Sequence, residues 1–92
     1  MNKAQSLTVE LTIINKLGLH ARAAAKFVKC AMQFQSQIYL SKDGERCDGK
    51  SIMSLLMLAA EKGSCVILEV SGIDQDQAMQ TLKELIERGF DE

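Results

Sequence analysis

Residues 7–34 read LTVELTIINKLGLHARAAAKFVKCAMQF and contain the change of apolar period that decides the fold. Over residues 7–15, apolar side chains alternate with polar ones, which predicts a strand with one buried face. Gly18 interrupts this pattern, and from His20 to Phe34 the apolar residues return at helical spacing. The predicted inward stripe of this helix consists of Ala21, Ala24, Phe27, Val28 and Ala31. The stretch therefore predicts a strand and an amphipathic helix, joined by a short loop that ends at His20.

The same two periods alternate along the rest of the chain. Strands are predicted over residues 37–41, 45–48 and 65–70, and helices over residues 51–60 and 74–89. Ser51 and Asp74 are residue types that cap helix N-termini, and Gln77 follows Asp74 at the spacing of a capping box. Gly63 is expected to close the shorter helix as a left-handed C-cap. The order strand, helix, strand, strand, helix, strand, helix predicts one two-layer α+β domain over residues 1–92, with helices on one face of an antiparallel sheet.

Composition excludes several functional classes. Of the 92 residues, 47% are apolar and 25% are charged, as in ordinary globular domains. The formal net charge of −1 lacks the basic surplus with which nucleic-acid binders neutralise phosphates. A single histidine and three cysteines without a CxxC pair do not make a metal-binding set, so no metal and no cofactor is expected. The odd cysteine count, with neither a signal peptide nor a run of roughly 20 apolar residues, predicts a cytoplasmic protein without membrane insertion.

His20 lies where the first predicted loop becomes a helix. The unpaired amides and partial positive charge of a helix N-terminus attract phosphate, and Arg22 can offer a planar set of donors to phosphate oxygens. A neutral imidazole can also act as a nucleophile near neutral pH. These residues are compatible with phosphoryl transfer through His20, although a histidine at a helix start is more often an exposed or capping residue. From the residues alone, both interpretations stay open.

The sequence Gly18-Leu19-His20-Ala21-Arg22, followed by Ala24, resembles the phosphohistidine motif of the HPr family, the phosphocarriers of the bacterial phosphotransferase system. The resemblance covers nearly the whole chain and includes residues 50–53, 60–63 and 74–90. It implies an HPr-like open-faced β-sandwich, in which three helices cover a four-stranded antiparallel sheet in the order βαββαβα. It also implies that His20 accepts a phosphoryl group from enzyme I, which phosphoenolpyruvate has charged, and that Arg22 stabilises the phosphate. The group then passes to an enzyme IIA, so the resemblance implies a phosphoryl-transfer intermediate rather than a free-standing turnover enzyme.

Ala23 departs from the family pattern, in which proline usually follows the arginine. Proline is favoured in a first helical turn because its φ is preset, so Ala23 is expected to keep the function with a less rigid helix start. Residues 15–18, 54–58 and 89–92 are similar to the nitrogen-related branch of the family, often called NPr. This similarity implies a regulatory enzyme IIA as the acceptor, and the alternative is the sugar-transport HPr branch.

The predicted helix over residues 51–60 is apolar on more than one face, so part of it must stay exposed. The expected core residues are Leu55, Leu58 and Ala59. The expected exposed patch, beside the first helix, consists of Ile52, Met53 and Leu56. Lys26 and Lys29 are expected to give this patch a basic rim, which together predicts a docking surface for acidic partner proteins. The alternative is that Met53 fills a gap in the core.

Ser51 resembles the regulatory serine of HPr proteins that are substrates of HPr kinase/phosphorylase. The resemblance implies a second phosphorylation site, and a phosphate there would add negative charge to the docking surface. The alternative for Ser51 is an ordinary N-cap. An alternative for the whole chain is a regulatory module controlled by Ser51 phosphorylation, although the intact pair of His20 and Arg22 favours the carrier.

Overall fold

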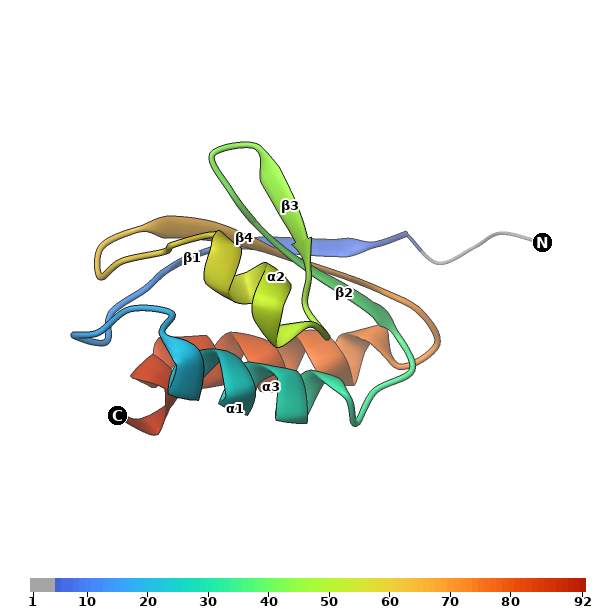
Figure 1. Cartoon of the computed structure of the whole chain (residues 1–92). Coiled ribbons are helices and arrows are strands. Elements are labelled where there is room, and N and C mark those ends of the chain that lie inside the picture. The colour runs from blue at the N-terminus through green and yellow to red at the C-terminus, as the bar shows by residue number, and fades with distance from the viewer. Residues whose placement is uncertain (1–4) are drawn as a thin grey trace.

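The computed structural model describes residues 5–92. Its strands are β1 (Leu7–Thr12), β2 (Gln37–Lys42), β3 (Glu45–Asp48) and β4 (Cys65–Ser71). Its helices are α1 (Ala21–Ala31), α2 (Ile52–Met57), α3 (Gln75–Glu87) and the short 3-10 helix η1 (Gly89–Asp91). Figure 1 shows the three α-helices on one face of the sheet. The predicted α+β fold with the order βαββαβα is confirmed.

The sheet has the strand order β1-β4-β2-β3, and each neighbouring pair is antiparallel. β4 lies between β1 and β2, and its register with β1 runs from Leu7 opposite Val70 to Thr12 opposite Cys65. The alternation of apolar and polar residues fixes this register, because side chains two positions apart point to the same face. The buried side chains of β4 are Val66, Leu68 and Val70. The other face of the sheet carries no helix, as Figure 1 shows for residues 5–92.

Helix α1 buries a slightly different stripe from the predicted one. Its fully buried residues are Ala23, Ala24, Phe27 and Ala31. Ala21 is exposed, so its predicted core position is wrong, whereas Val28 is partly buried and packs against the core as predicted. At about 100° per residue, Ala21 lies nearly opposite Ala23 and faces away from the core. Phe27 and Phe90, both fully buried, are the largest side chains in the core.

Helix α2 ends well before the predicted C-cap. Met57 is its last residue, and Ala59 takes a left-handed φ of 51° that stops the helix. Ala59 is therefore exposed and Ala60 is buried, which corrects the prediction that Ala59 joins the core. Gly63, with φ +91°, lies in the turn before β4, where its N–H donates to the carbonyl of Ile13 at 2.7 Å. β1 and α1 likewise end earlier than predicted.

Asp74 does not form the predicted capping box. Its carboxylate instead accepts hydrogen bonds from the backbone N–H of Gln35 at 2.8 Å, and from the backbone N–H and the hydroxyl of Ser36. These bonds, the one from the Ser36 hydroxyl above all, lower the pKa of Asp74. The side chain thus connects the start of α3 to the loop between α1 and β2, in place of a local cap.

We expect an Asp74→Asn variant to be less stable than the original chain at pH 7 and to lose less stability in acid. Because the pKa of Asp74 is lower in the folded state, the folded chain binds fewer protons than the unfolded chain. The contribution of Asp74 is therefore present above about pH 4 and is lost as the pH falls through its folded-state value. Urea unfolding between pH 7 and pH 2.5 measures this slope.

The variant's slope should be shallower but not flat, since the pKa values of Asp91 and Glu92 are also lowered. Asp76→Asn is the matched control, because Asp76 is an exposed carboxylate in the first turn of the same helix. An acid slope that is the same in the Asp74 and Asp76 variants would contradict the role given to Asp74.

Candidate functional site

His20 is the N-cap residue of α1, and its Nδ1 accepts a hydrogen bond from the backbone N–H of Arg22 at 3.3 Å. The loop before it is fixed by the backbone N–H of Leu19, which donates to the carbonyl of Ala60 at 2.8 Å. Gly18 has a left-handed φ of +67°, and a Cβ there would lie 2.5 Å from the same Ala60 oxygen. Only glycine fits this approach of two loops, which places the imidazole at the first turn of α1.

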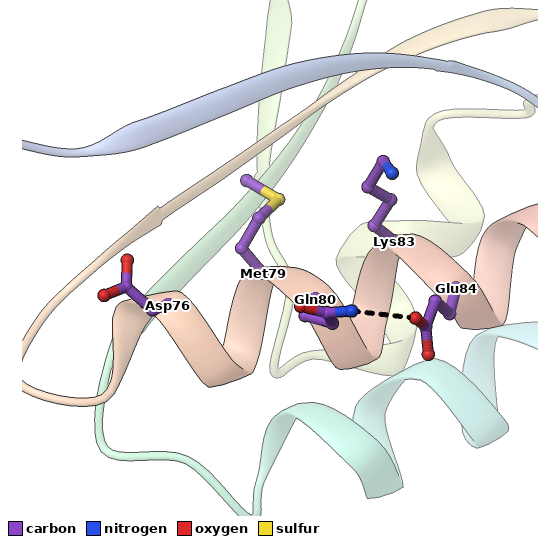
Figure 2. A pocket seen from close by; sticks show the side chains of 5 residues that line it. All are labelled: Asp76, Met79, Gln80, Lys83 and Glu84. Carbon is purple, nitrogen blue, oxygen red and sulfur yellow. Dashed lines mark hydrogen bonds between the residues drawn. The ribbon is translucent and has the colours of Figure 1, made fainter.

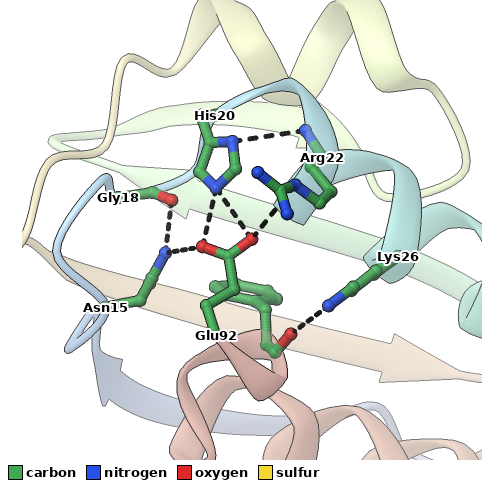
Figure 3. Close-up of polar contacts among 7 residues, drawn as sticks. Asn15, Gly18, His20, Arg22, Lys26 and Glu92 are labelled. Atoms are coloured by element: carbon green, nitrogen blue, oxygen red, sulfur yellow. Dashed lines mark hydrogen bonds and ion pairs between the residues drawn. The ribbon is translucent and has the colours of Figure 1, made fainter.

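Glu92 lies against the other edge of the imidazole (Figure 3). Its two carboxylate oxygens are 2.7 and 2.9 Å from Nε2 of His20. The side-chain amide of Asn15 donates to the same carboxylate at 3.3 Å, and Nε of Arg22 is 3.9 Å from it. The hydrogen bond from His20, followed by that from Asn15, lowers the pKa of Glu92. Because an ionised carboxylate only accepts hydrogen bonds, Nε2 carries the proton and Nδ1 keeps its lone pair.

Arg22 and Lys26 lie close to this pair and make different contacts. The side chain of Arg22 is 72% exposed, and its guanidinium makes only the long 3.9 Å contact with Glu92. Lys26 is held, because its Nζ donates to the carbonyl of Phe90 at 2.9 Å. Both residues line a surface hollow beside the His20–Glu92 pair, together with Lys16, Leu17, Asp91 and Glu92. The site thus combines an imidazole, a helix N-terminus and an exposed guanidinium.

A sequence model of the family described as "PTS HPr component phosphorylation site" matches residues 7–88. The chain belongs to the HPr family. This HPr-family chain is 50% identical to the phosphocarrier protein HPr of Neisseria meningitidis over 86 residues, which cover 94% of the chain and 97% of that relative. It is 53% identical to the phosphocarrier protein HPr of Pseudomonas aeruginosa over 85 residues, covering 91% of the chain and 94% of the relative.

The solved structure of HPr-C-His from Thermoanaerobacter tengcongensis has the same fold, with a TM-score of 0.90 and 43% sequence identity. The match covers 94% of this chain and 97% of that one. The family that the sequence resembles, the phosphocarriers of the phosphotransferase system, is therefore confirmed.

Helix α2 of this HPr-family chain presents an apolar surface to solvent, which we call the α2 patch. Its members are Ile52 (40% exposed), Met53 (73%), Leu56 (37%) and Met57 (70%). The first three are exposed as predicted, and the alternative in which Met53 fills a core gap is wrong. Leu55 and Leu58 are buried as predicted. Met57 joins the patch because α2 is short and its last turn faces solvent.

Lys26 and Lys29 lie in a groove between α1 and α3 that no α2 residue lines. Their partners in this groove include Thr81, Leu85 and Arg88. The structure thus places these two lysines beside α3 and does not show them as a rim of the α2 patch, and their part in docking stays a prediction.

Ser51 is the N-cap of α2, as predicted, and its hydroxyl accepts a hydrogen bond from the backbone N–H of Ser54 at 3.2 Å. The side chain is half-buried and directly precedes the α2 patch. Ala23, at the place where the family usually has proline, is fully buried in the first turn of α1. α1 begins at Ala21 without a proline to preset its backbone.

Two residues of the site were missed by sequence reasoning, Asn15 and Glu92. Asn15 is buried and its side-chain amide also donates to the carbonyl of Gly18 at 2.7 Å, which places it between the loop and Glu92. Both residues belong to segments that resemble the NPr branch, but the resemblance implied no chemical role for either side chain. The contact between His20 and Glu92 spans 72 positions, so no local spacing indicates it.

A separate hollow lies along α3 (Figure 2). All five of its lining residues belong to that helix: Asp76, Met79, Gln80, Lys83 and Glu84. Its one hydrogen bond joins the amide of Gln80 to the carboxylate of Glu84 at 3.0 Å. None of the residues around His20 lines it, so it adds nothing to the site. Within residues 5–92, every helix is too short or too polar to cross a membrane.

Proposed function

We propose that this chain accepts a phosphoryl group on Nδ1 of His20 from an enzyme I-type protein and donates it to an enzyme IIA-type protein. The observation that carries the proposal is the pair of hydrogen bonds on the imidazole. Nε2 lies 2.7 Å from the Glu92 carboxylate and holds the proton, which leaves Nδ1 unprotonated with its lone pair available. Nδ1 lies at the N-terminus of α1, 3.3 Å from the backbone N of Arg22.

The surroundings of Nδ1 suit a phosphoryl group. The first-turn amides of α1 attract an anion, and α1 has no acidic residue in that turn. The exposed guanidinium of Arg22 can donate two parallel hydrogen bonds to phosphate oxygens. Acceptance forms a bond between Nδ1 and phosphorus while the bond between phosphorus and the donor breaks. Donation to the acceptor is the same step in reverse.

We also propose that the acceptor belongs to the nitrogen-related branch. Residues 15–18 and 89–92, which resemble NPr, both contribute to the site, since Asn15 and Glu92 bind each other beside His20. The sugar-transport branch is the alternative. Docking of either partner is proposed to use the α2 patch, because methionine-rich apolar surfaces adapt to more than one partner.

The decisive experiment compares two complete phosphotransfer chains from one cell type. The purified chain is incubated with labelled phosphoenolpyruvate and catalytic amounts of enzyme I from either the sugar branch or the nitrogen branch, and then with the matching enzyme IIA. We expect an acid-labile label on His20. Both its formation by enzyme I and its transfer to enzyme IIA should be faster with the nitrogen-branch pair. If neither enzyme I protein transferred label to the chain, the carrier function would be overturned. Faster transfer through the sugar pair would overturn only the branch.

A reducing compartment suits the three cysteines, Cys30, Cys47 and Cys65, which are all free. We therefore place the chain in the cytoplasm, together with its proposed partners.

We further propose that Ser51 is a regulatory phosphorylation site for an HPr kinase/phosphorylase. Its hydroxyl directly precedes Ile52 and Met53, so a phosphate there would bring about two negative charges to the edge of the α2 patch. An apolar surface that must be desolvated in a complex is a poor place for such a charge. The expected consequence is weaker docking of partner proteins.

Incubation with the kinase and ATP should therefore label Ser51 and slow the later phosphorylation of His20 by enzyme I. Mapping of the label by mass spectrometry and a time course with phosphoenolpyruvate measure the two effects. Ser51→Ala should abolish the label. Ser54→Ala removes a hydroxyl about one turn further along α2 and keeps the backbone N–H that is bonded to Ser51, so it should keep the label. Label that persists in Ser51→Ala would contradict the assignment.

A further inference from the structure

Phosphoryl transfer through Nδ1 does not by itself explain Glu92, although this side chain makes close contacts with the imidazole. Its carboxylate is 2.7 and 2.9 Å from Nε2 of His20 and is also bound by Asn15 at 3.3 Å. The side chains of Glu92 and His20 are only 15% and 22% exposed. The Glu92 carboxylate is thus largely shielded from water, and its two hydrogen-bond donors fix its position.

We call residues 89–92 the 89–92 hook. Its backbone has an unusual conformation that places the Glu92 carboxylate beside the imidazole. Gly89, Phe90 and Asp91 all take left-handed φ values, of 67°, 57° and 63°. This conformation is unfavourable for residues with a Cβ, so it persists only where other contacts enforce it.

Three contacts enforce the conformation of the 89–92 hook. The side chain of Phe90 is fully buried in the core, and its carbonyl accepts the hydrogen bond from Lys26 at 2.9 Å. The guanidinium of Arg88 donates to the carboxylate of Asp91 at 2.8 Å. Figure 3 shows Glu92 between the C-terminal helix ribbon and the imidazole, on the ring edge opposite to the one that faces Arg22 N.

From this geometry we infer that Glu92 is the positioning residue of His20, which fixes the proton on Nε2 and so directs phosphoryl transfer to Nδ1. The inference rests on the proposed function and deepens it, since it names the group that makes Nδ1 the nucleophile. An imidazole without such a partner exchanges its proton between both nitrogens, and the nitrogen that bears the proton cannot attack phosphorus.

The same contact stabilises the charge that the reaction creates. The lone pair of Nδ1 forms the bond to phosphorus, and the electron pair of the donor's bond to phosphorus stays with the donor. The ring keeps its Nε2 proton and becomes positively charged, next to the negative Glu92 carboxylate. When the phosphoryl group leaves, the electron pair returns to Nδ1, and the leaving group is a neutral imidazole rather than an imidazolate. Glu92 and the phosphoryl group occupy opposite edges of the ring, so neither displaces the other.

Three variants test the role of Glu92. Glu92→Gln keeps the shape but can donate as well as accept, Glu92→Asp keeps the charge on a shorter side chain, and Glu87→Gln removes an equal charge from the exposed side of α3. Two measurements are made on each. The ¹⁵N chemical shifts of the imidazole at pH 8 report which nitrogen carries the proton. The rate of phosphorylation is measured with phosphoramidate, a small donor that needs no docking, and with enzyme I.

We expect the original chain and Glu87→Gln to hold the proton on Nε2. Glu92→Gln should show a mixture of both tautomers. Its rate with either donor should fall by about ten- to a hundredfold, by analogy with the loss of the carboxylate that orients a metal-ligating histidine. The loss should appear in kcat with KM for enzyme I unchanged, and Glu92→Asp should recover part of it.

Glu92→Gln with an unchanged tautomer, or with an unchanged or higher rate, would overturn the inference. These outcomes are distinct from a failure of the proposed function. In that case the original chain takes no phosphoryl group on His20 from either donor, whatever its tautomer.

Discussion

Exchange of His20 for asparagine is expected to abolish phosphoryl acceptance and to leave the chain folded. Asparagine is among the best N-cap residues, so α1 can begin at the same place in the variant. An amide nitrogen has no free lone pair with which to attack phosphorus, and the sequence has no other histidine. Labelled phosphoenolpyruvate with enzyme I measures acceptance, and far-ultraviolet circular dichroism measures the fold.

The matched comparison is Ser51→Ala, which removes the N-cap hydroxyl of the neighbouring helix and should still be labelled at His20. Loss of a helix N-cap costs about 1 kcal/mol of stability. An acid-labile phosphate on the folded His20→Asn chain would contradict the assignment of the nucleophile, because it would have to reside on another residue.

Gly18→Ala is expected to have the largest effect on stability among changes that add a single methyl group near the site. The left-handed φ of +67° costs about 1–2 kcal/mol for a residue with a Cβ. The new Cβ would also lie 2.5 Å from the carbonyl of Ala60, so the two loops must separate. Overpacking of this kind typically costs a further 1–3 kcal/mol, roughly. Since Leu19 N donates to the same carbonyl, we expect His20 to be displaced and the rate of phosphorylation to fall as well.

Gly63→Ala separates the two contributions. Gly63 has a similar φ of +91°, but a Cβ there would meet nothing within 4 Å. Its variant should therefore show only the backbone penalty of about 1–2 kcal/mol and an unchanged phosphorylation rate. Thermal unfolding measures the difference, at about 4–8 °C for each kcal/mol in a domain of this size. Equal losses of stability in both variants would mean that the contact with Ala60 has no part in fixing the loop.

The order of elements could be predicted from the sequence because the apolar period changes at each boundary between a strand and a helix. Leu7, Val9 and Leu11 alternate with polar residues, and apolar residues recur at every second position of β4, so both strands follow from their own residues. The ends of elements were harder to predict. Ala59 ends α2 through a left-handed backbone, although alanine is the residue that best favours helix.

Errors in the prediction of side-chain partners share one physical cause, which is competition from residues distant in sequence. Asp74 and Gln77 match a capping box, but the carboxylate finds three donors in Gln35 and Ser36 on another loop. His20 and Arg22 were predicted as a local pair, and the motif places both correctly at the start of α1. Glu92 was not predicted as part of the site, because its proximity to His20 and Arg22 depends on the packing of α3 and on the 89–92 hook.

The contact between His20 and Glu92 also bears on the order of folding during synthesis, because the two residues are 72 positions apart. His20 is made well before β4, which must pair with β1, and before Glu92. By our inference Glu92 places the imidazole proton, so a nascent chain displays the histidine before its tautomer is fixed. We therefore expect the site to become competent only once residues 89–92 have been made and have folded against it.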